Sequence, residues 1–245
     1  MTEESADEGR LRDLEAAEEK RTESRRLDHR FELLEAIILS IAAVLAAWTG
    51  FQAAKWGGVQ ANSYSQAGAS RVESTRASTE AGQQTTVDVV TFTEWLSALE
   101  NEGLLDQPID PNQPYEPDPN TVSGFLYSRF RPEFKVAADA WVATHPRLNP
   151  EAPTTPFVMP EYRVAASERS GELEQQAEAQ AATAREANQR SDNYVLMTIV
   201  FATVLFFAGI SSKMDTFRAR TFLLGTACTI LVVAIVVVVA FPKEV

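Results

Sequence analysis

Four residues with oxygen ligands lie close together in the stretch 103–120 (GLLDQPIDPNQPYEPDPN). Calcium binds carboxylate and amide oxygens of this kind. Prolines at 111, 114, 117 and 119 interrupt these ligands, and the glycine that an EF-hand loop needs is missing. We therefore expect a solvated loop, with a metal site as the less favoured alternative. The four residues are Asp110, Asn112, Glu116 and Asp118.

Groups suited to catalysis are sparse. The chain has two histidines, His29 and His145, and it contains no HExxH, GxSxG or GxxxxGK pattern. A nucleophile needs an activating base, and in the central segment that base would have to be His145, which precedes Pro146 in an expected turn. The sequence therefore predicts a protein that is not an enzyme. We assign no catalytic, cofactor-binding or metal-binding residue and expect no cofactor.

Polar residues recur in an apolar run that begins at Leu33 (LLEAIILSIAAVLAAW) and continues toward Ala54. Ser40, Thr49 and Gln52 would line a pore in an oligomer, although hydrogen bonding between helices is the commoner use of such residues. The run also contains Glu35, which lies barely one turn inside it. We expect this carboxylate to face the cytoplasmic interface.

That run is one of three that are long enough for a helix to cross a bilayer. We expect transmembrane helices at 33–52, 194–210 and 222–241, because buried helices of soluble proteins have apolar runs of only roughly 10–14 residues. The first run follows 32 residues rich in charge and lacks a convincing cleavage site. It therefore reads as a retained anchor rather than a signal peptide.

Small residues and the single cysteine lie within these runs. Ala43 with Ala47, and Ala46 with Gly50, supply small-residue contacts for packing against another helix, either in the same chain or in another copy. Cys228, the only cysteine, lies in the third run, where it reads as a packing or lipid-facing residue.

Basic residues near the ends of the runs indicate an orientation. Because Lys and Arg stay on the cytoplasmic side, we expect the tail 1–32 and the link 211–221 inside, and 53–193 and 242–245 outside. We expect residues 10–30 to form a solvated helix that leads into the first span, with a frayed tip at Met1–Gly9. Eight basic residues lie on the inner side and four on the outer: Lys20, Arg21, Arg25, Arg26, Arg30, Lys213, Arg218 and Arg220, against Lys55, Arg185, Arg190 and Lys243.

The outer segment 53–193 is acidic. It holds 20 Asp and Glu against 11 Lys and Arg, which accounts for most of the net charge of −12. Such a surface repels nucleic acid and anionic headgroups, so nucleic acid is not an expected partner.

Two stretches of this segment predict long helices. Residues 51–100 contain no proline, and 164–193 is rich in strong helix formers. We expect them to form an antiparallel stalk with arms of roughly 70 and 45 Å, so the longer arm must bend or be covered at its far end. The seven-residue spacing gives a seam of small residues that suits close helix pairing: Ala53, Gln60, Ala67, Ser74, Ala81, Asp88 and Trp95.

The covering element is expected at 121–144, where Pro132 and Glu133 are typical of a first helical turn. Its apolar residues should form a small core with the far end of the longer arm. The expected members are Phe134, Ala138, Trp141 and Val142; Phe125, Leu126 and Phe130; and Phe92, Trp95, Leu96 and Leu99.

A proline-rich segment, 149–162 (NPEAPTTPFVMPEY), follows this element. Disordered linkers contain few apolar and aromatic residues, whereas this segment contains Phe157, Val158, Met159 and Tyr162. Prolines lower the entropy lost on ordering an extended chain. We therefore predict an ordered strap that packs these residues over the longer arm, with partner binding as the second choice.

Several motifs resemble a group of uncharacterised bacterial membrane proteins. They are GFQAAKWGGVQANSYSQA (50–67), RFRPEF (129–134), the strap sequence, and ANQRSDNYVLMTIVFATVLFFAGIS (187–211). The similarity covers most of 33–211. Because that group has no assigned activity, the resemblance implies residence in the bacterial inner membrane and this architecture, but no functional residue.

We therefore expect an all-α membrane protein with three transmembrane helices, a long antiparallel helical stalk and a small helical cap outside the membrane. Its expected role is a non-enzymatic scaffold or a subunit of a membrane complex that associates with itself or with another membrane protein. A channel or transporter component whose first span lines a pore is the alternative. Sensing by the cap is a third possibility, although the sequence locates no ligand pocket for it.

Overall fold

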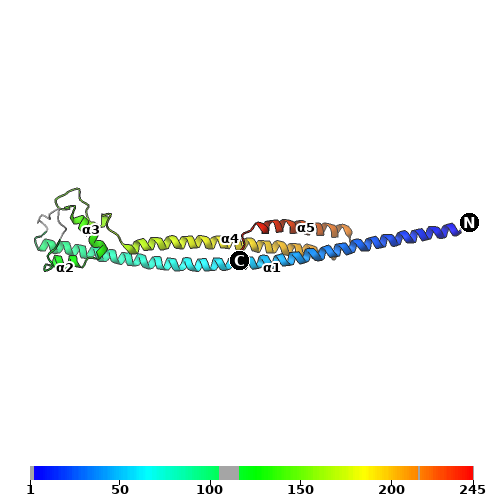
Figure 1. Cartoon of the computed structure of the whole chain (residues 1–245), viewed down its shortest axis with the longest axis horizontal. Coiled ribbons are helices and arrows are strands. Elements are labelled where there is room, and N and C mark those ends of the chain that lie inside the picture. Colours follow the sequence, from blue (N-terminus) through cyan, green and yellow to red (C-terminus); the bar gives the residue numbers. More distant parts are fainter. Residues whose placement is uncertain (1–2, 105–115, 215, 245) are drawn as a thin grey trace. The chain divides into compact units, whose positions relative to one another are not determined.

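The computed structural model describes the backbone of residues 3–104, 116–214 and 216–244, and within these ranges the side chains from His29 onward. The described residues form helices and turns, with no strand, so the predicted all-α class is confirmed (Figure 1). The elements are α1 (Glu3–Asn101), α2 (Val122–Ser128), α3 (Pro132–Val142), the 3₁₀ turn η1 (Pro156–Val158), α4 (Ala165–Ser211) and α5 (Phe217–Ala240).

Three helices, α1, α4 and α5, are long and apolar enough to cross a membrane. They contain the three predicted spans, apart from Phe241 at the end of the third. Residues 10–30 belong to α1, as predicted, but α1 begins at Glu3 and therefore includes most of the tip that was predicted to be frayed. The side chains of residues 1–28 lie outside the described part. Because α5 begins at Phe217, Arg218 and Arg220 lie in its first turn rather than in a loop.

The chain divides into two compact units. Met1–Ser63 with Ala182–Val245 forms the first, which we call the span unit, and Tyr64–Ala181 forms the second, the cap unit. In the span unit, α1, α4 and α5 bury small and branched side chains against one another. The buried cluster is Ile38, Ala42, Phe201, Val204, Ala208, Leu224, Ala227, Leu231, Ala234 and Val238.

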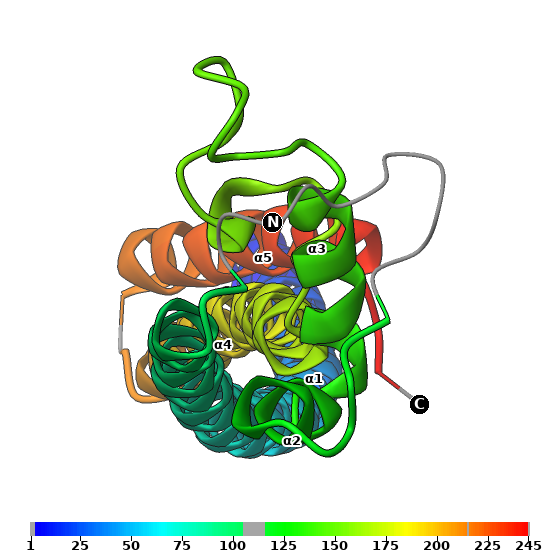
Figure 2. The ribbon, with the colours of Figure 1, turned by 90° about the vertical axis from the view of Figure 1, so that its left-hand side faces the viewer.

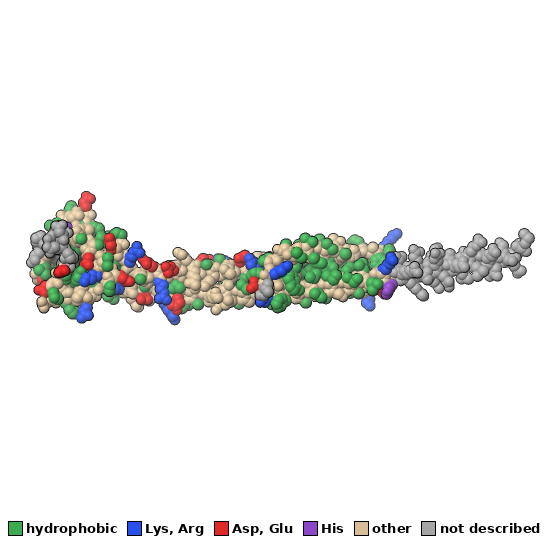
Figure 3. Space-filling view, viewed as in Figure 1, with side chains coloured by type: hydrophobic (Ala, Val, Ile, Leu, Met, Phe, Trp, Pro, Cys, Tyr) green, Lys and Arg blue, Asp and Glu red, His purple; other side chains and the backbone are tan. Residues whose placement is uncertain are grey.

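The outward surface of the span unit is apolar as well. Val232, Val236 and Val239 of α5 are each more than half exposed, although α5 has buried valine and leucine on its other side. Figure 3 shows a band of hydrophobic side chains over this unit, with Lys and Arg at its edges. A contiguous apolar surface of this kind is costly in water, and it is what a hydrocarbon environment requires.

The predicted small-residue seam on α1 is buried in both units, except that Gln60 is half-buried. In the cap unit, Ser70 donates a hydrogen bond to Gln180 over 3.0 Å, and Ser74 donates to the carbonyl of Ser170 over 3.0 Å. In the span unit, Gln60 donates to the side chain of Asn188 over 2.8 Å. The buried seam residues are Ala53, Ala67, Ser74, Ala81, Asp88 and Trp95.

The end of α1 carries the predicted aromatic core, and Figure 2 shows α2 and α3 beside it. One predicted member is wrong: Phe125 is 52% exposed, because α2 turns Tyr127 inward instead. Arg129 lies over the outward Phe125 ring at 5.0 Å. The buried members are Phe92, Trp95, Leu99, Tyr127, Phe130, Phe134, Ala138, Trp141 and Val142, with Leu96 and Leu126 partly buried.

The strap is ordered and packs against this core. The Phe157 ring stacks on Phe134 with centroids 5.2 Å apart, and Met159 and Tyr162 join the same cluster. The Trp141 indole donates to the carbonyl of Pro153 over 2.7 Å. Val158 was predicted to pack as well, but it is 65% exposed. Because η1 has three residues per turn, its successive side chains point in different directions and one of them faces solvent.

Candidate functional site

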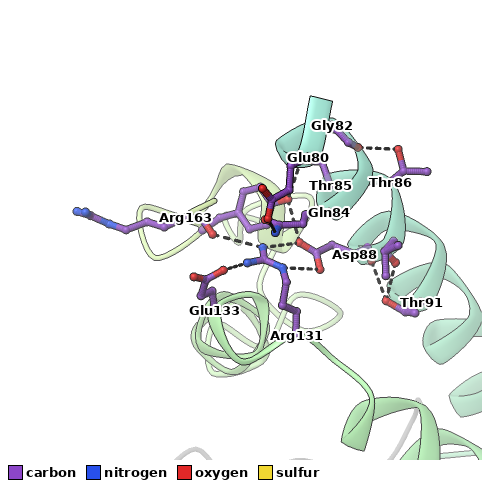
Figure 4. A network of polar contacts seen from close by, with 12 residues as sticks. Glu80, Gly82, Gln84, Thr85, Thr86, Asp88, Thr91, Arg131, Glu133 and Arg163 are labelled. Atoms are coloured by element: carbon purple, nitrogen blue, oxygen red, sulfur yellow. Dashed lines mark hydrogen bonds and ion pairs between the residues drawn. The ribbon is translucent and has the colours of Figure 1, made fainter. Parts of the chain in front are cut away.

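A buried ion pair joins three segments of the cap unit (Figure 4). Arg131 Nη2 donates to Asp88 Oδ2 over 2.8 Å, and Arg131 Nε lies 3.4 Å from Oδ1. The Tyr162 hydroxyl donates to the same Oδ2 over 3.2 Å. The Asp88 side chain is 1% exposed and that of Arg131 is 17% exposed. Both carboxylate oxygens therefore already accept hydrogen bonds from within the unit.

Each member of this cluster is placed by local sequence. Asp88 occupies an inward position of the α1 seam, one heptad after Ala81. Arg131 directly precedes Pro132 at the start of α3, and Tyr162 ends the strap. Arg131 also pairs with Glu133 of the first α3 turn. The sequence prediction of the strap found Tyr162, but it missed the ion pair, since nothing in the spacing connects residues 88 and 131.

The phenol of Tyr162 remains a neutral donor in this setting. Partial burial raises its pKa above the ordinary value, and the charge of Asp88 adds to the increase. Tyr162 also lies 3.4 Å from Thr85 Oγ1. The chemistry of the cluster is therefore that of a clasp between α1, α3 and the strap, because its carboxylate is occupied and its phenol stays protonated.

A groove of about 530 Å³ opens beside the clasp. Ser78, Gly82 and Thr85 of α1 line one side, and Arg163 and Ser167 line the other. The Arg163 side chain points away from Asp88 (Figure 4) and pairs with Glu168 over 3.4 Å. The groove is thus lined by hydroxyl-bearing side chains, and its charged edge is already paired.

The span unit holds a second buried ion pair. Glu35 accepts hydrogen bonds from Arg220 Nε over 3.0 Å and from Ser211 Oγ over 2.8 Å. The prediction that Glu35 faces the cytoplasmic interface is therefore wrong, because the carboxylate turns toward α4 and α5. The sequence prediction missed this pair because it assigned Arg220 to the link 211–221 rather than to a helix. Glu35 near the start of the first predicted span and the arginines at 218 and 220 just before the third were the available signal.

Two of the three polar residues considered for a pore, Thr49 and Gln52, point inward. The buried Thr49 hydroxyl shares a hydrogen bond of 2.9 Å with Thr198. Gln52 forms two hydrogen bonds with the backbone of Glu244, donating over 3.1 Å and accepting over 3.0 Å. Ser40 is exposed and donates to the carbonyl of Ala36 on its own helix. Thr49 and Gln52 therefore bond to other segments of the chain, whereas Ser40 bonds only to its own helix.

The remaining candidates have structural or solvent-exposed positions. His145 is in a turn with φ of 52°, and its carbonyl accepts hydrogen bonds from Leu148 and Asn149. His29 is exposed beside Glu32, and Cys228 is exposed on α5.

The predicted acidic loop is described only in part. Asp110 and Asn112 lie outside the described residues. The Asp118 side chain accepts from Asn120 in a local turn, and Glu116 is exposed. Among the described side chains, no three His, Cys, Asp or Glu gather as metal ligands would.

Comparison with known proteins adds no assignment. No protein family, curated protein or solved structure matches this chain. The resemblance to bacterial membrane proteins therefore stays a prediction from the sequence.

Proposed function

We propose that this protein is a non-enzymatic scaffold or a subunit of a membrane complex in the bacterial inner membrane. In this proposal α1, α4 and α5 cross the bilayer, the N-terminus is cytoplasmic and residues 53–193 lie outside. The three apolar helices and the exposed apolar surface of the span unit support the membrane location.

One observation carries the choice of a scaffold over a channel. Thr49 and Gln52, which a pore would need on its lining, bond to Thr198 and to the Glu244 backbone. Polar groups with partners inside a helix bundle hold helices together and are not available to water or ions. Glu35 and Arg220 likewise neutralise each other.

The outer domain in this proposal is an antiparallel stalk formed by α1 and α4, with a cap of α2, α3 and the strap. Hydrogen bonds within the cap unit from Ser70 to Gln180 and from Ser74 to Ser170 support this pairing. The packed aromatic core gives the cap a fixed surface, which is what a binding domain requires.

The test is chemical cross-linking and co-purification of the full chain from native membranes. We expect a discrete complex that contains a second protein or a second copy. A variant with the clasp removed, Arg131→Met, should lose an outer-domain partner, whereas the exposed Arg163→Met is the matched control. A strictly monomeric chain with no co-purifying protein would contradict the proposal. Ion conductance in reconstituted bilayers that disappears in Gln52→Leu but not in Ser40→Ala would establish the channel instead.

A further inference from the structure

One exposed face of α1 in the cap unit carries no charge. Between Gly82 and Thr93 the helix turns Asp88 and Phe92 inward, and its exposed side is uncharged. Val87 is 57% exposed and Val90 is 49% exposed. The exposed residues are Gly82, Gln83, Thr86, Val87, Val89, Val90 and Thr93.

This composition is unusual for a helix surface that faces only water. Branched Val and Thr are weaker helix formers than the Glu and Gln that cover the exposed side of α4, for example at Glu172, Glu174 and Gln175. Exposing valine side chains to water also gives no hydrophobic stabilisation. A partner that covers this side of α1 accounts for both features.

The exposed side has the spacing of a helix-pairing seam. From Val72 to Ser97, exposed residues recur at alternating intervals of four and three, as in a heptad repeat. Arg76 is the one charged member, and it pairs with Glu73 on its own helix over 2.7 Å. We call this set the outer seam: Val72, Arg76, Thr79, Gln83, Thr86, Val90, Thr93 and Ser97.

The span unit presents a comparable set on α1. Ala36, Ser40, Ala43, Ala47 and Ala54 are exposed and Gly50 is half-exposed, again at intervals of four and three. A Cβ added at Gly50 would meet no atom within 4 Å, so nothing inside the chain requires glycine there. In a bilayer, small residues at this spacing let a second helix approach closely.

We propose that α1 pairs in parallel with α1 of a second copy through the outer seam. The inference rests on the proposed membrane insertion, because two copies in one bilayer share the same orientation and the same height. A parallel pair then places each seam residue against its own counterpart. Charged residues would repel one another in that arrangement, and seven of the eight seam positions are uncharged.

The rest of the domain favours the same partner and the same face. The outer segment is acidic, so two copies repel each other on most of their surface. Glu73, Glu80 and Glu94 flank the seam on one side, whereas Thr75, Gly82 and Val89 flank it on the other. In a parallel pair each glutamate of one helix faces an uncharged residue of the other, so like charges do not meet.

Disulfide cross-linking of the full chain in native membranes tests this pairing. In a Cys228→Ala background, Val90→Cys places a thiol on the seam, and Gln175→Cys places one on the exposed side of α4 as a matched control. We expect oxidation to give a dimer of Val90→Cys and to leave Gln175→Cys monomeric. Adding Thr86→Glu to Val90→Cys should abolish the dimer, while circular dichroism shows unchanged helix content.

Two results would overturn the pairing. Equal cross-linking of Val90→Cys and Gln175→Cys indicates random collision. Failure of Val90→Cys to form a dimer also rejects the pairing. Labelling of the thiol by maleimide would then mean that this surface is exposed to solvent, and no labelling would mean that something other than a second α1 covers it. If a different protein still co-purifies in that case, the scaffold proposal stands and only the self-pairing fails.

Discussion

At the residue scale, the two buried carboxylates share one arrangement. Asp88 in the cap unit accepts hydrogen bonds from an arginine and from a tyrosine hydroxyl. Glu35 in the span unit accepts hydrogen bonds from an arginine and from a serine hydroxyl. Removing a charge from water costs several kcal/mol unless partners replace the lost hydration. Because these partners come from distant parts of the chain, each carboxylate links separate elements of its unit.

Breaking the clasp from the arginine side should destabilise the cap unit. Arg131→Met leaves Asp88 buried without its counter-charge, so we expect a loss of about 3 kcal/mol in the free energy of unfolding, the low end for a buried pair because Arg131 is partly exposed. Urea unfolding of the full chain in detergent measures this loss. Fluorescence of Trp95 and Trp141 reports on the cap once Trp48 and Trp56 are replaced by Phe.

Arg163→Met provides the control for that measurement, since the Arg163 side chain is exposed and its ion pair is on the surface. Its effect should stay within about 0.5 kcal/mol. Equal effects of the two substitutions would mean that the Asp88 contact does not stabilise the domain.

Glu102 is expected to make the stability of the cap depend on pH. Its carboxylate accepts from the Ser123 hydroxyl and from the backbone N–H groups of Ser123 and Val122. These bonds, the Ser123 hydroxyl first, lower its pKa from the ordinary value of 4.5. A carboxylate whose pKa is lower in the folded state stabilises it fully above the unfolded value, and this contribution is lost as pH falls through the folded value.

We therefore expect the urea midpoint of the cap to fall as pH is lowered below about 4.5, with a smaller fall in Glu102→Gln. Glu100→Gln is the control, because Glu100 is exposed on the same helix end. A Glu102→Gln profile that matches the unsubstituted chain would remove Glu102 from this role.

At the element scale, the strap is held by rings rather than by its prolines alone. Phe157 stacks on Phe134 and meets Phe92 and Tyr162 edge to face, whereas its neighbour Val158 faces solvent. Phe157→Ala should cost about 2 kcal/mol, less than a fully buried phenylalanine, and Val158→Ala less than about 0.5 kcal/mol. Urea unfolding of both variants checks the difference, and comparable losses would show that the strap packs otherwise.

Two helical glycines of the cap unit should respond oppositely to alanine. A Cβ at Gly124 of α2 would collide with the Asp118 carbonyl, whereas one at Gly171 of α4 would meet no atom within 4 Å. Gly124→Ala should lower the free energy of unfolding by about 1–3 kcal/mol, as overpacking does. Gly171→Ala should raise it by up to about 1 kcal/mol. Thermal unfolding compares them, and stabilisation by Gly124→Ala would contradict the close approach.

The spacing of apolar and small residues predicted the long helices well, because residues at seven-residue intervals lie on the same face of a helix. The buried seam through Ala67, Ser74 and Ala81 follows from seven-residue spacing alone. The errors at Phe125 and Val158 arose in short segments. There a shift of one residue in where the helix or turn begins changes which side chains point inward. The two ion pairs were missed for another reason: long-range contacts depend on where separate helices begin, and no local pattern states that Arg220 lies in α5.

At the scale of the whole molecule, charge and apolar surface are divided between parts of the chain. The span unit exposes apolar side chains with basic residues at the edges of its apolar band, and the segment 53–193 carries most of the negative charge. This division suits a chain with one part in lipid and an acidic part in water. The proposed orientation rests on the eight basic residues against four near the ends of the spans, since Lys and Arg are retained on the cytoplasmic side.

The orientation can be tested with single thiols in a Cys228→Ala background. Leu148→Cys lies at an exposed site of the cap unit, and Ser212→Cys lies at an exposed site between α4 and α5. With the N-terminus inside, a membrane-impermeant maleimide should label Leu148→Cys in intact spheroplasts. It should reach Ser212→Cys only after the membrane is opened. The reverse pattern would place eight basic residues outside and four inside, against the charge rule, and would overturn the topology. Labelling of both sites in intact spheroplasts would mean that the link does not lie behind the membrane, so that α4 and α5 do not both cross it.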